Sequence, residues 1–290
     1  MVLPLLRAAR PHQWVKNSFV AAPLVFAQRM DDMTAVTRTL IAIACFCLLS
    51  SSIYLLNDLV DVEKDRAHPV KRMRPIAAGT LSVGAARIAA VLAAMIGLGV
   101  GAWLSPMFAG VGGGYLVLNI AYSFWLKRIA FVDVACIALG FLLRVLGGAY
   151  AIPVPPSWWL LGCTVLLAAF LGFGKRAHEL RVAGQRSTVQ RAVLGSYHPG
   201  VLRALLVGLA LATTVVYAAY TLSPHALASF GSRGLFLTVP FVAFGVFRFI
   251  RITGTKSDAE SPTDSMLRDG LFLLNIGAYA LTIVLVIYLL

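Results

Sequence analysis

Four of the chain's twelve acidic residues fall within the ten positions from 57 to 66, directly after an apolar run. A helix formed by that run inside a membrane would deliver these carboxylates to one membrane face. If the helix continues, Asp58, Asp61 and Asp65 lie at i, i+3 and i+7 on one stripe. Asn57 then lies one turn from Asp61. Oxygen ligands on one helix face suit Mg²⁺, which keeps its waters and shares substrate phosphates, so the spacing predicts a magnesium site at these four residues.

The alternative is a solvated helix end whose acids pair with neighbouring basic side chains. Those neighbours are Lys64, Arg66, Lys71 and Arg72. Charge runs are usually solvated faces, but ionisable groups gathered at the end of a membrane span more often mark a functional site. The location therefore favours the metal site.

Composition places the chain among integral membrane proteins. Of its 290 residues 59% are hydrophobic and 13% are charged, and the mean hydropathy of +0.83 lies far outside the soluble globular range. Apolar stretches of spanning length, about 17 to 25 residues, occur at 16 to 29, 35 to 56, 82 to 104, 107 to 126, 131 to 152, 157 to 174, 202 to 221, 234 to 252 and 270 to 290. We predict one all-α membrane domain over residues 1 to 290, with nine transmembrane helices. No removable signal peptide is expected.

The distribution of Lys and Arg predicts the topology. With the N-terminus inside, most of the 25 basic residues lie on the cytoplasmic side, in segments 1 to 16, 57 to 81, 127 to 130, 175 to 201 and 248 to 269. The positive-inside rule favours this orientation. The expected protein is therefore a multi-pass plasma-membrane protein whose acidic stretch faces the cytoplasm and whose C-terminus lies outside.

A net charge of +13 and a pI near 10.1 would suggest a nucleic-acid partner in a soluble protein. In a membrane protein, topology and anionic lipid headgroups explain the charge, so we expect membrane lipids and no nucleic acid as partners. A phosphate-rich substrate is compatible with the same charge. The four cysteines lie in predicted spans without CxxC spacing, which predicts neither disulfides nor a metal site.

Basic residues after the acidic stretch are candidates for binding a diphosphate beside the metal. Lys71, Arg72 and Arg74 offer point charges and guanidinium forks of the kind that phosphates prefer. Arg66, within the stretch, is a further candidate. The positive-inside bias explains these residues almost as well, so the sequence leaves both interpretations open.

Other polar candidates lie close to or inside the spans. Lys16 and Asn17 either belong to an interfacial helix or line the mouth of a cavity. Arg144, about midway along the fifth span, should face the bundle interior, where it binds substrate or makes a structural pair. The remaining candidates at the cytoplasmic end of the fourth span are Tyr122, Lys127 and Arg128.

A basic segment follows the sixth span and begins with Lys175 and Arg176. On a helix Glu179 lies one turn from Lys175, close enough for the two side chains to interact. The segment occupies in the second half of the chain the place that the acidic stretch has in the first half. Its charge is opposite.

The residues Asn57, Asp58, Asp61 and Asp65 match position for position the Asn-Asp-x-x-Asp-x-x-x-Asp motif of the UbiA superfamily of intramembrane transferases, and the resemblance covers essentially the whole chain. It implies a helical bundle around a central cavity open to the cytoplasm and to lipid. It also implies that Mg²⁺ holds a substrate diphosphate there.

Most such families carry a second aspartate-rich motif after the sixth helix, where this chain has Lys175-Arg176-x-x-Glu179. That departure, with Arg10-Pro11-x-Gln13-Trp14-x-Lys16-Asn17 and Gly140-Phe141-x-x-Arg144, resembles the decaprenyl-phosphate phosphoribosyltransferase branch. The resemblance implies transfer of a 5-phosphoribosyl group from phosphoribosyl diphosphate to a polyprenyl phosphate such as decaprenyl phosphate, for cell-wall arabinan synthesis. Asp58 and Asp61 would then act through the metal, and Lys175 and Arg176 would hold phosphates.

Two other functions stay open. A prenyltransferase of the same superfamily would use a prenyl diphosphate donor, and a second carboxylate cluster would favour it. A transporter predicts ionisable residues near the midplane of several spans, whereas Arg144 is the clear case here. The sequence decides neither the length of the lipid nor whether the protein is a homo-oligomer.

Overall fold

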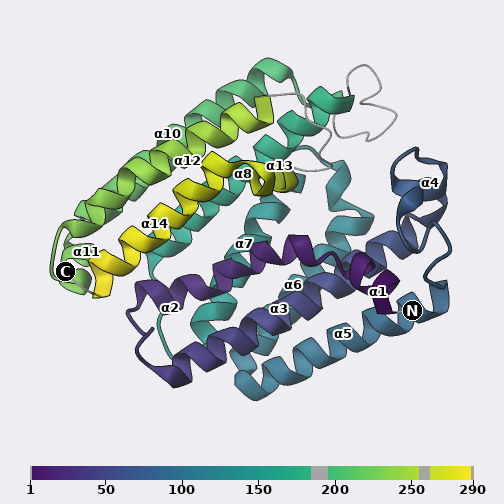
Figure 1. Cartoon of the computed structure of the whole chain (residues 1–290), viewed down its shortest axis with the longest axis horizontal. Helices are drawn as coiled ribbons and strands as arrows, with labels where there is room; N and C mark the ends of the chain where they lie inside the picture. Colours follow the sequence, from purple (N-terminus) through teal and green to yellow (C-terminus); the bar gives the residue numbers. More distant parts are fainter. Residues whose placement is uncertain (1, 184–194, 255–261, 289–290) are drawn as a thin grey trace. The chain divides into compact units, whose positions relative to one another are not determined.

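The computed structural model describes residues 2–183, 195–254 and 262–288, and this part of the chain is helical without β-strands (Figure 1). It divides into two compact units. Unit 1 comprises Met1–Phe124 and Gly140–Pro156, and unit 2 comprises Trp125–Leu139 and Ser157–Leu290. Helix α7 (Val132–Ala151) contributes its first eight residues to unit 2 and the others to unit 1.

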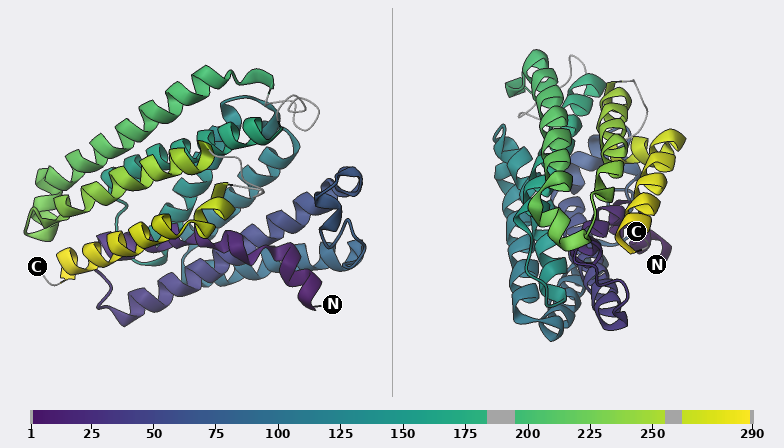
Figure 2. Two further views of the ribbon diagram at one scale, coloured as in Figure 1. Left: turned by 45° about the horizontal axis from the view of Figure 1, so that its top comes forward. Right: turned by 90° about the vertical axis from the view of Figure 1, so that its left-hand side faces the viewer.

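Unit 1 is built around the long helix α3, which packs most extensively on α5; the two run side by side in the left view of Figure 2. Besides α7, its elements are α1 (Val2–Ala9), the 3₁₀ segment η1 (Pro11–Ala21), α2 (Ala22–Phe26), α3 (Met33–Val60), α4 (Val62–Ala67), η2 (Lys71–Met73), α5 (Val83–Leu104) and α6 (Pro106–Phe124). Asp32 caps α3, because its carboxylate accepts from the backbone N–H groups of Thr34 and Ala35 at 2.9 and 3.1 Å.

Small residues let the helices of unit 1 approach one another closely. A Cβ added at Gly148 of α7 would lie 2.0 Å from the Val20 carbonyl oxygen of η1, and one at Gly147 would lie 2.5 Å from the Phe46 ring. Phe46 is completely buried and packs edge-on against Phe108. These contacts follow the general rule that small residues permit close helix packing in membranes. They hold η1 against α7.

Arg38 of α3 binds the ends of two neighbouring helices. Its guanidinium donates to the Ala151 carbonyl at the end of α7 at 2.6 Å, and to the Leu104 carbonyl at the end of α5. Carbonyl groups at helix ends have no partner within their own helix. A single guanidinium thereby donates hydrogen bonds to carbonyl groups at the ends of two helices of unit 1.

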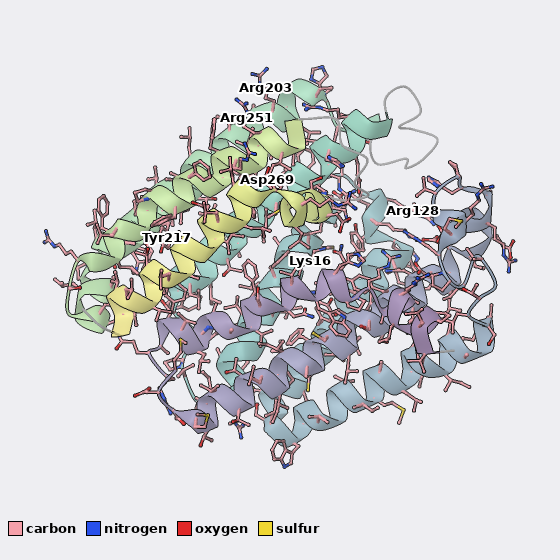
Figure 3. The ribbon with its side chains drawn as sticks, in the orientation of Figure 1. Lys16, Arg128, Arg203, Tyr217, Arg251 and Asp269 are labelled. Atoms are coloured by element: carbon pink, nitrogen blue, oxygen red, sulfur yellow. The ribbon has the colours of Figure 1, made fainter. Side chains whose placement is uncertain are left out.

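Unit 2 has an aromatic core in which Phe170 of α8 packs on Phe249 of α12 with ring centroids 5.0 Å apart. Besides its part of α7, its elements are η3 (Leu126–Arg128), α8 (Trp158–Ala183), α10 (Pro199–Leu222), α11 (Pro224–Phe230), η6 (Gly234–Thr238), α12 (Val239–Gly254), α13 (Pro262–Arg268) and α14 (Gly270–Tyr288). Figure 3 shows Arg203 and Arg251 at one end of this unit, where α10 begins and α12 ends.

Eight helices of the described residues are long and apolar enough to cross a membrane, which makes the chain a multi-pass membrane protein. They correspond to eight of the nine predicted spans. The predicted span at 16 to 29 is not among them, because that stretch forms part of η1, the short helix α2 and a turn. Proline at positions 11 and 23 and the buried polar side chains of Gln13 and Asn17 account for its irregular backbone. The prediction of a single domain over 1 to 290 stays a prediction.

Candidate functional site

The acidic stretch lies where α3 ends. The helix stops at Val60, Asp61 is its C-terminal cap, and α4 begins at Val62. Backbone hydrogen bonds of 2.9 Å from Asp61 N–H to the Asn57 carbonyl and 2.8 Å from Asp65 N–H to the Asp61 carbonyl carry the helical path across this break. Asp61, with a φ of −94° and a ψ of 10°, is the residue at which α3 gives way to α4.

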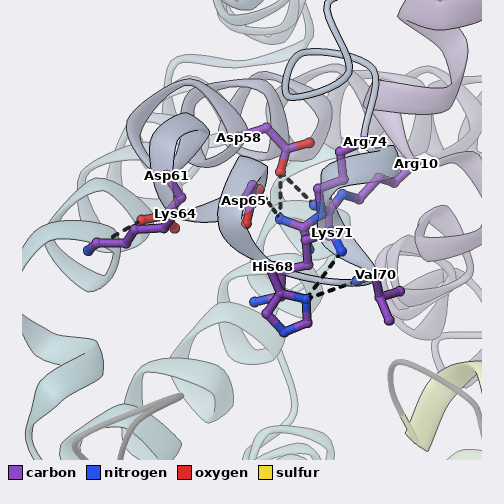
Figure 4. Close-up of polar contacts among 9 residues, drawn as sticks. All are labelled: Arg10, Asp58, Asp61, Lys64, Asp65, His68, Val70, Lys71 and Arg74. Carbon is purple, nitrogen blue, oxygen red and sulfur yellow. Dashed lines mark hydrogen bonds and ion pairs between the residues drawn. The ribbon is translucent and has the colours of Figure 1, made fainter.

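Arg74 joins two of the predicted metal ligands. Its Nη1 lies 3.1 Å from Asp58 Oδ1 and 2.8 Å from Asp65 Oδ2 (Figure 4). Asp58 is 2% exposed and Asp65 is 3% exposed, so both carboxylates are buried against this one guanidinium. Buried carboxylates require such a partner, because an unpaired charge loses its hydration without compensation. The prediction that Arg74 binds a diphosphate beside the metal stays a prediction.

Arg10, which the sequence analysis named only as part of a motif, was not predicted as a site residue. Its Nη2 lies 2.6 Å from Asp58 Oδ1, and its guanidinium lies 5.3 Å from the centroid of the Tyr54 ring. The contact spans 48 residues of sequence, which no local pattern reveals. The signal that could have found it is the position of Arg10 directly before Pro11, in the same segment as Lys16 and Asn17.

The other charged residues of the stretch pair locally. Asp61 Oδ1 lies 4.0 Å from Lys64 Nζ, and Glu63 Oε1 lies 2.8 Å from Arg66 Nη1. In Figure 4 Asp61 and Lys64 lie apart from the group formed by Asp58, Asp65 and Arg74. The structure thus brings Asp58 and Asp65 together and leaves Asp61 on a different side. The remaining candidates of this stretch are half-buried Asn57 on α3, and Lys71 and Arg72 on η2.

The donor atoms fit Mg²⁺ by their chemistry. Asp58, Asp61 and Asp65 offer carboxylate oxygens, the ligand type that Mg²⁺ prefers. Among the described residues, no three acidic, histidine or cysteine side chains converge closely enough to form a metal cage. The cations that pair with Asp58 in this structure are the guanidinium groups of Arg10 and Arg74.

Arg144 lies within unit 1 and is 5% exposed. Its Nε donates to Asn17 Oδ1 at 2.8 Å, its Nη1 to the Gly140 carbonyl at 2.9 Å, and its Nη2 to the Tyr115 hydroxyl at 2.9 Å. Within the described part of unit 1, these partners are all neutral oxygens. The prediction that Arg144 faces the protein interior is confirmed, and the structure adds Tyr115 as a partner.

Polar side chains of η1 also donate hydrogen bonds to side chains of α3. Asn17 Nδ2 donates to Ser50 Oγ at 3.4 Å, and Trp14 Nε1 donates to Ser51 Oγ at 3.1 Å. Lys16 Nζ donates to Gln13 Oε1 at 2.5 Å, and Figure 3 places Lys16 on η1. Asn17 is completely buried, so its role within the structure is to anchor η1 and to hold Arg144.

In unit 2 the predicted phosphate ligand Arg176 is completely buried. Its Nε lies 2.7 Å from Asp133 Oδ2, and its Nη1 contacts Glu179 Oε2. Asp133, also completely buried, accepts from the Tyr197 hydroxyl at 2.6 Å, and that hydroxyl accepts from the Phe131 N–H at 2.7 Å. Burial and the hydrogen bond to Asp133 raise the pKa of Tyr197. Arg176 therefore joins α7, α8 and the segment before α10.

The other candidates after α6 occupy different elements. Tyr122 lies half-buried near the end of α6 in unit 1. Lys127 and Arg128 belong to η3 in unit 2, and Lys175 lies half-buried on α8, one residue before Arg176. Since neighbouring residues of a helix point in different directions, the burial of Arg176 does not bury Lys175.

A pocket of about 370 Å³ lies at the opposite end of α3 from the acidic stretch. Its lining includes Arg29, Asp32 and Arg38. Arg29 and Asp32 form an ion pair, and Arg38 caps two helix ends. The hydrogen bonds that occupy these charges favour a structural role for this end of unit 1.

Comparison with known proteins adds a family and a fold. The model of the UbiA prenyltransferase family matches residues 18–276. The chain is 38% identical to a decaprenyl-phosphate phosphoribosyltransferase of Mycolicibacterium smegmatis over 77% of this chain and 71% of that protein. It is 35% identical to the enzyme of the same name from Corynebacterium glutamicum over 98% and 86% of the two chains. A UbiA homologue of Archaeoglobus fulgidus solved with GPP and Mg²⁺ has a similar fold, with a TM-score of 0.70 at 18% identity over 97% and 99% of the chains.

Proposed function

Since the chain belongs to the UbiA prenyltransferase family, we propose that it transfers a 5-phosphoribosyl group from phosphoribosyl diphosphate to a polyprenyl phosphate and releases diphosphate. The observation that carries this proposal is the 35% identity, over 98% of the chain, to a decaprenyl-phosphate phosphoribosyltransferase. The expected location is the plasma membrane, with the acidic stretch facing the cytoplasm, and the product would supply arabinan assembly in the cell wall.

The charges of the chain agree with these substrates. The donor carries a diphosphate on C1 and a separate 5-phosphate, and the lipid brings a third phosphate group. The acidic stretch would bind the diphosphate through a metal ion. The 5-phosphate and the lipid phosphate would then need basic side chains as partners. Candidates for those cations are Lys71, Arg72, Arg74, Lys127, Arg128 and Lys175.

Asp58, Asp61 and Asp65, with Asn57, would hold Mg²⁺. When bound there, Mg²⁺ would neutralise the negative charge that develops on the leaving diphosphate. Its presence in a solved homologue of the same fold supports this proposal. Asp58 and Asp65 are buried and paired with arginines, whereas the side chain of Asp61 is 28% exposed.

The acceptor needs no general base from the protein. A phosphate monoester is already ionised near neutral pH, with a second pKa of about 6. Its oxygen would attack C1 of the ribose in line with the C1–O bond to diphosphate, which breaks with inversion at C1. The protein's contribution is to position the substrates and to stabilise the departing charge.

Arg144 and Arg176 take different parts in this proposal. Arg144 is a buried cation held by neutral oxygens, so its charge is available to attract an anionic substrate. Arg176 is held by Asp133 and Glu179, so we assign it a positioning role and give phosphate binding in that segment to Lys175.

A prenyl donor is the competing assignment, because the solved homologue of this fold binds GPP. For the deciding experiment, the purified protein is placed in lipid nanodiscs that contain decaprenyl phosphate. One sample then receives labelled phosphoribosyl diphosphate and the other receives labelled geranyl diphosphate. We expect label from the first donor in the lipid fraction. Transfer from geranyl diphosphate alone to an added aromatic acceptor would contradict the proposal.

A further inference from the structure

Arg10 and Arg74 cover the carboxylate that a metal would have to reach. Asp58 is 2% exposed, whereas the side chains of Arg10 and Arg74 are 24% and 21% exposed. Both guanidinium groups approach the same oxygen, Asp58 Oδ1, at 2.6 and 3.1 Å. A cation arriving from solvent therefore meets the two arginines before it meets the carboxylate.

The charges within this group cancel. Asp58 and Asp65 carry two negative charges, and Arg10 and Arg74 carry two positive charges at neutral pH. A divalent metal added to the carboxylates would leave both guanidinium groups facing a like charge in a poorly hydrated place. A diphosphate arriving with the metal removes this conflict, because its oxygens accept the forked donors of arginine.

The backbone of Arg10 indicates that its position is enforced. Its φ of 55° and ψ of 62° lie in the left-handed region, which is uncommon for a residue other than glycine and is disfavoured before a proline. Such strain persists only where the surroundings impose it, and it clusters at functional sites. Here it directs the side chain from the start of η1 to the end of α3.

We propose that Arg10 and Arg74 are exchangeable counter-ions: they neutralise Asp58 and Asp65 in the donor-free protein and move to the diphosphate oxygens when a metal binds the carboxylates. The inference rests on the proposed metal-diphosphate site. It predicts that metal alone binds weakly, because it must displace the arginines. It also predicts that metal and diphosphate bind together far more tightly than either alone.

The test measures binding of Mn²⁺, a spectroscopic substitute for Mg²⁺, to the purified full-length protein by electron paramagnetic resonance. We expect Arg10→Gln to tighten the binding of Mn²⁺ alone by about tenfold, since one charge-assisted bond to the buried carboxylate no longer competes. The same variant should weaken binding of inorganic diphosphate in the presence of Mn²⁺ by about tenfold. Unchanged or weaker binding of Mn²⁺ alone would overturn the proposal, as would unchanged binding of diphosphate.

Two further variants make the result specific. Arg7→Gln removes the same charge one turn earlier, from an exposed side chain of α1, and should change neither affinity by more than about twofold, the size expected of a screened surface charge. Arg10→Lys keeps the charge but loses the fork, so Mn²⁺ alone should bind as in the wild type and diphosphate should bind more weakly. If Arg10→Gln does not fold, unchanged diphosphate binding by Arg10→Lys overturns the proposal.

These measurements separate the exchange from the choice of donor. Inorganic diphosphate is common to phosphoribosyl and prenyl donors, so the exchange can hold even if phosphoribosyl diphosphate is not the substrate. Conversely, transfer from phosphoribosyl diphosphate with unchanged Mn²⁺ affinities in Arg10→Gln would sustain the proposed function and overturn the exchange.

Discussion

Arg144 of α7 donates from Nε to the Oδ1 of Asn17 in η1 at 2.8 Å, so a neutral amide holds a cation that is 5% exposed. A charge in this position is costly unless the protein uses it. Replacing Arg144 with an apolar residue leaves the buried Asn17 Oδ1 without this donor, which costs about 1 to 3 kcal/mol. Replacing Arg144 therefore tests whether its charge serves substrate binding or only the structure of unit 1.

We expect Arg144→Met to raise the apparent KM for the donor or the lipid phosphate by about tenfold, the effect of losing one charged hydrogen bond. The apparent Tm in detergent should change by no more than a few degrees. Steady-state kinetics and thermal unfolding measure the two quantities. A large fall in Tm with unchanged kinetics would assign Arg144 to structure alone.

The second prediction concerns the buried pair of Arg176 and Asp133. Asp133→Asn should lower stability by about 3 to 5 kcal/mol, because it leaves a completely buried guanidinium with a weaker partner. Tyr197→Phe removes one hydrogen bond to the same carboxylate and should cost about 1 to 2 kcal/mol. Thermal or denaturant unfolding in detergent checks both. Equal, negligible effects would contradict the structural role assigned to this network.

The apolar pattern predicted eight of the spans correctly, because length and hydropathy are local properties. The same pattern extended a span over 16 to 29, where buried Asn17 and two prolines produce η1 and α2 instead. The motif spacing located the acidic stretch. It did not reveal that α3 ends at Val60, nor that the side chain of Asp61 lies apart from those of Asp58 and Asp65.

Long-range ion pairs could not be predicted from the sequence. One partner of Asp58 lies 48 residues away at Arg10, and one partner of Arg176 lies in another helix at Asp133. The resemblance and the charge pattern together predicted Arg176 as a phosphate ligand, because a basic residue at a membrane surface has the same sequence signal whether it faces solvent or a buried carboxylate. Only tertiary structure separates these cases.

The third prediction tests the close approach of η1 to α7. Gly148→Ala places a Cβ 2.0 Å from the Val20 carbonyl oxygen, so η1 must move, and with it Asn17 and Arg10. We expect a loss of stability of about 1 to 3 kcal/mol from overpacking and reduced activity. Gly99→Ala of α5 is the matched control, because nothing lies within 4 Å of its added Cβ. An equally mild effect of both changes would contradict the packing described for α7.

The fourth prediction concerns pH. Asp269 caps α14 and is held by both Nε and Nη2 of Arg248 at 3.0 and 2.7 Å; Figure 3 shows it at the start of that helix. The hydrogen bond to Arg248 lowers the pKa of Asp269 below its ordinary value of 3.8. A lowered folded-state pKa gives stability that is present above the ordinary value and is lost as the pH falls through the folded-state value.

Asp269→Asn should therefore lower the apparent Tm at pH 7, and the difference from wild type should shrink as the pH falls below about 4. Thermal unfolding across this range measures it. A difference that is constant with pH would show that the charge of Asp269 contributes nothing beyond its capping hydrogen bond to Phe272.

The most direct test of the metal-diphosphate site is the Mg²⁺-dependent transfer of labelled phosphoribose to decaprenyl phosphate by Asp58→Ala and Asp61→Ala. Asp31→Ala, which removes an exposed carboxylate before α3, is the control for the loss of one negative charge. We predict that both site variants lose transfer by at least about a hundredfold, on the scale of removing one group that stabilises a transition-state charge, while Asp31→Ala stays near wild type. Near-normal rates in Asp58→Ala and Asp61→Ala, at wild-type expression, would contradict the account.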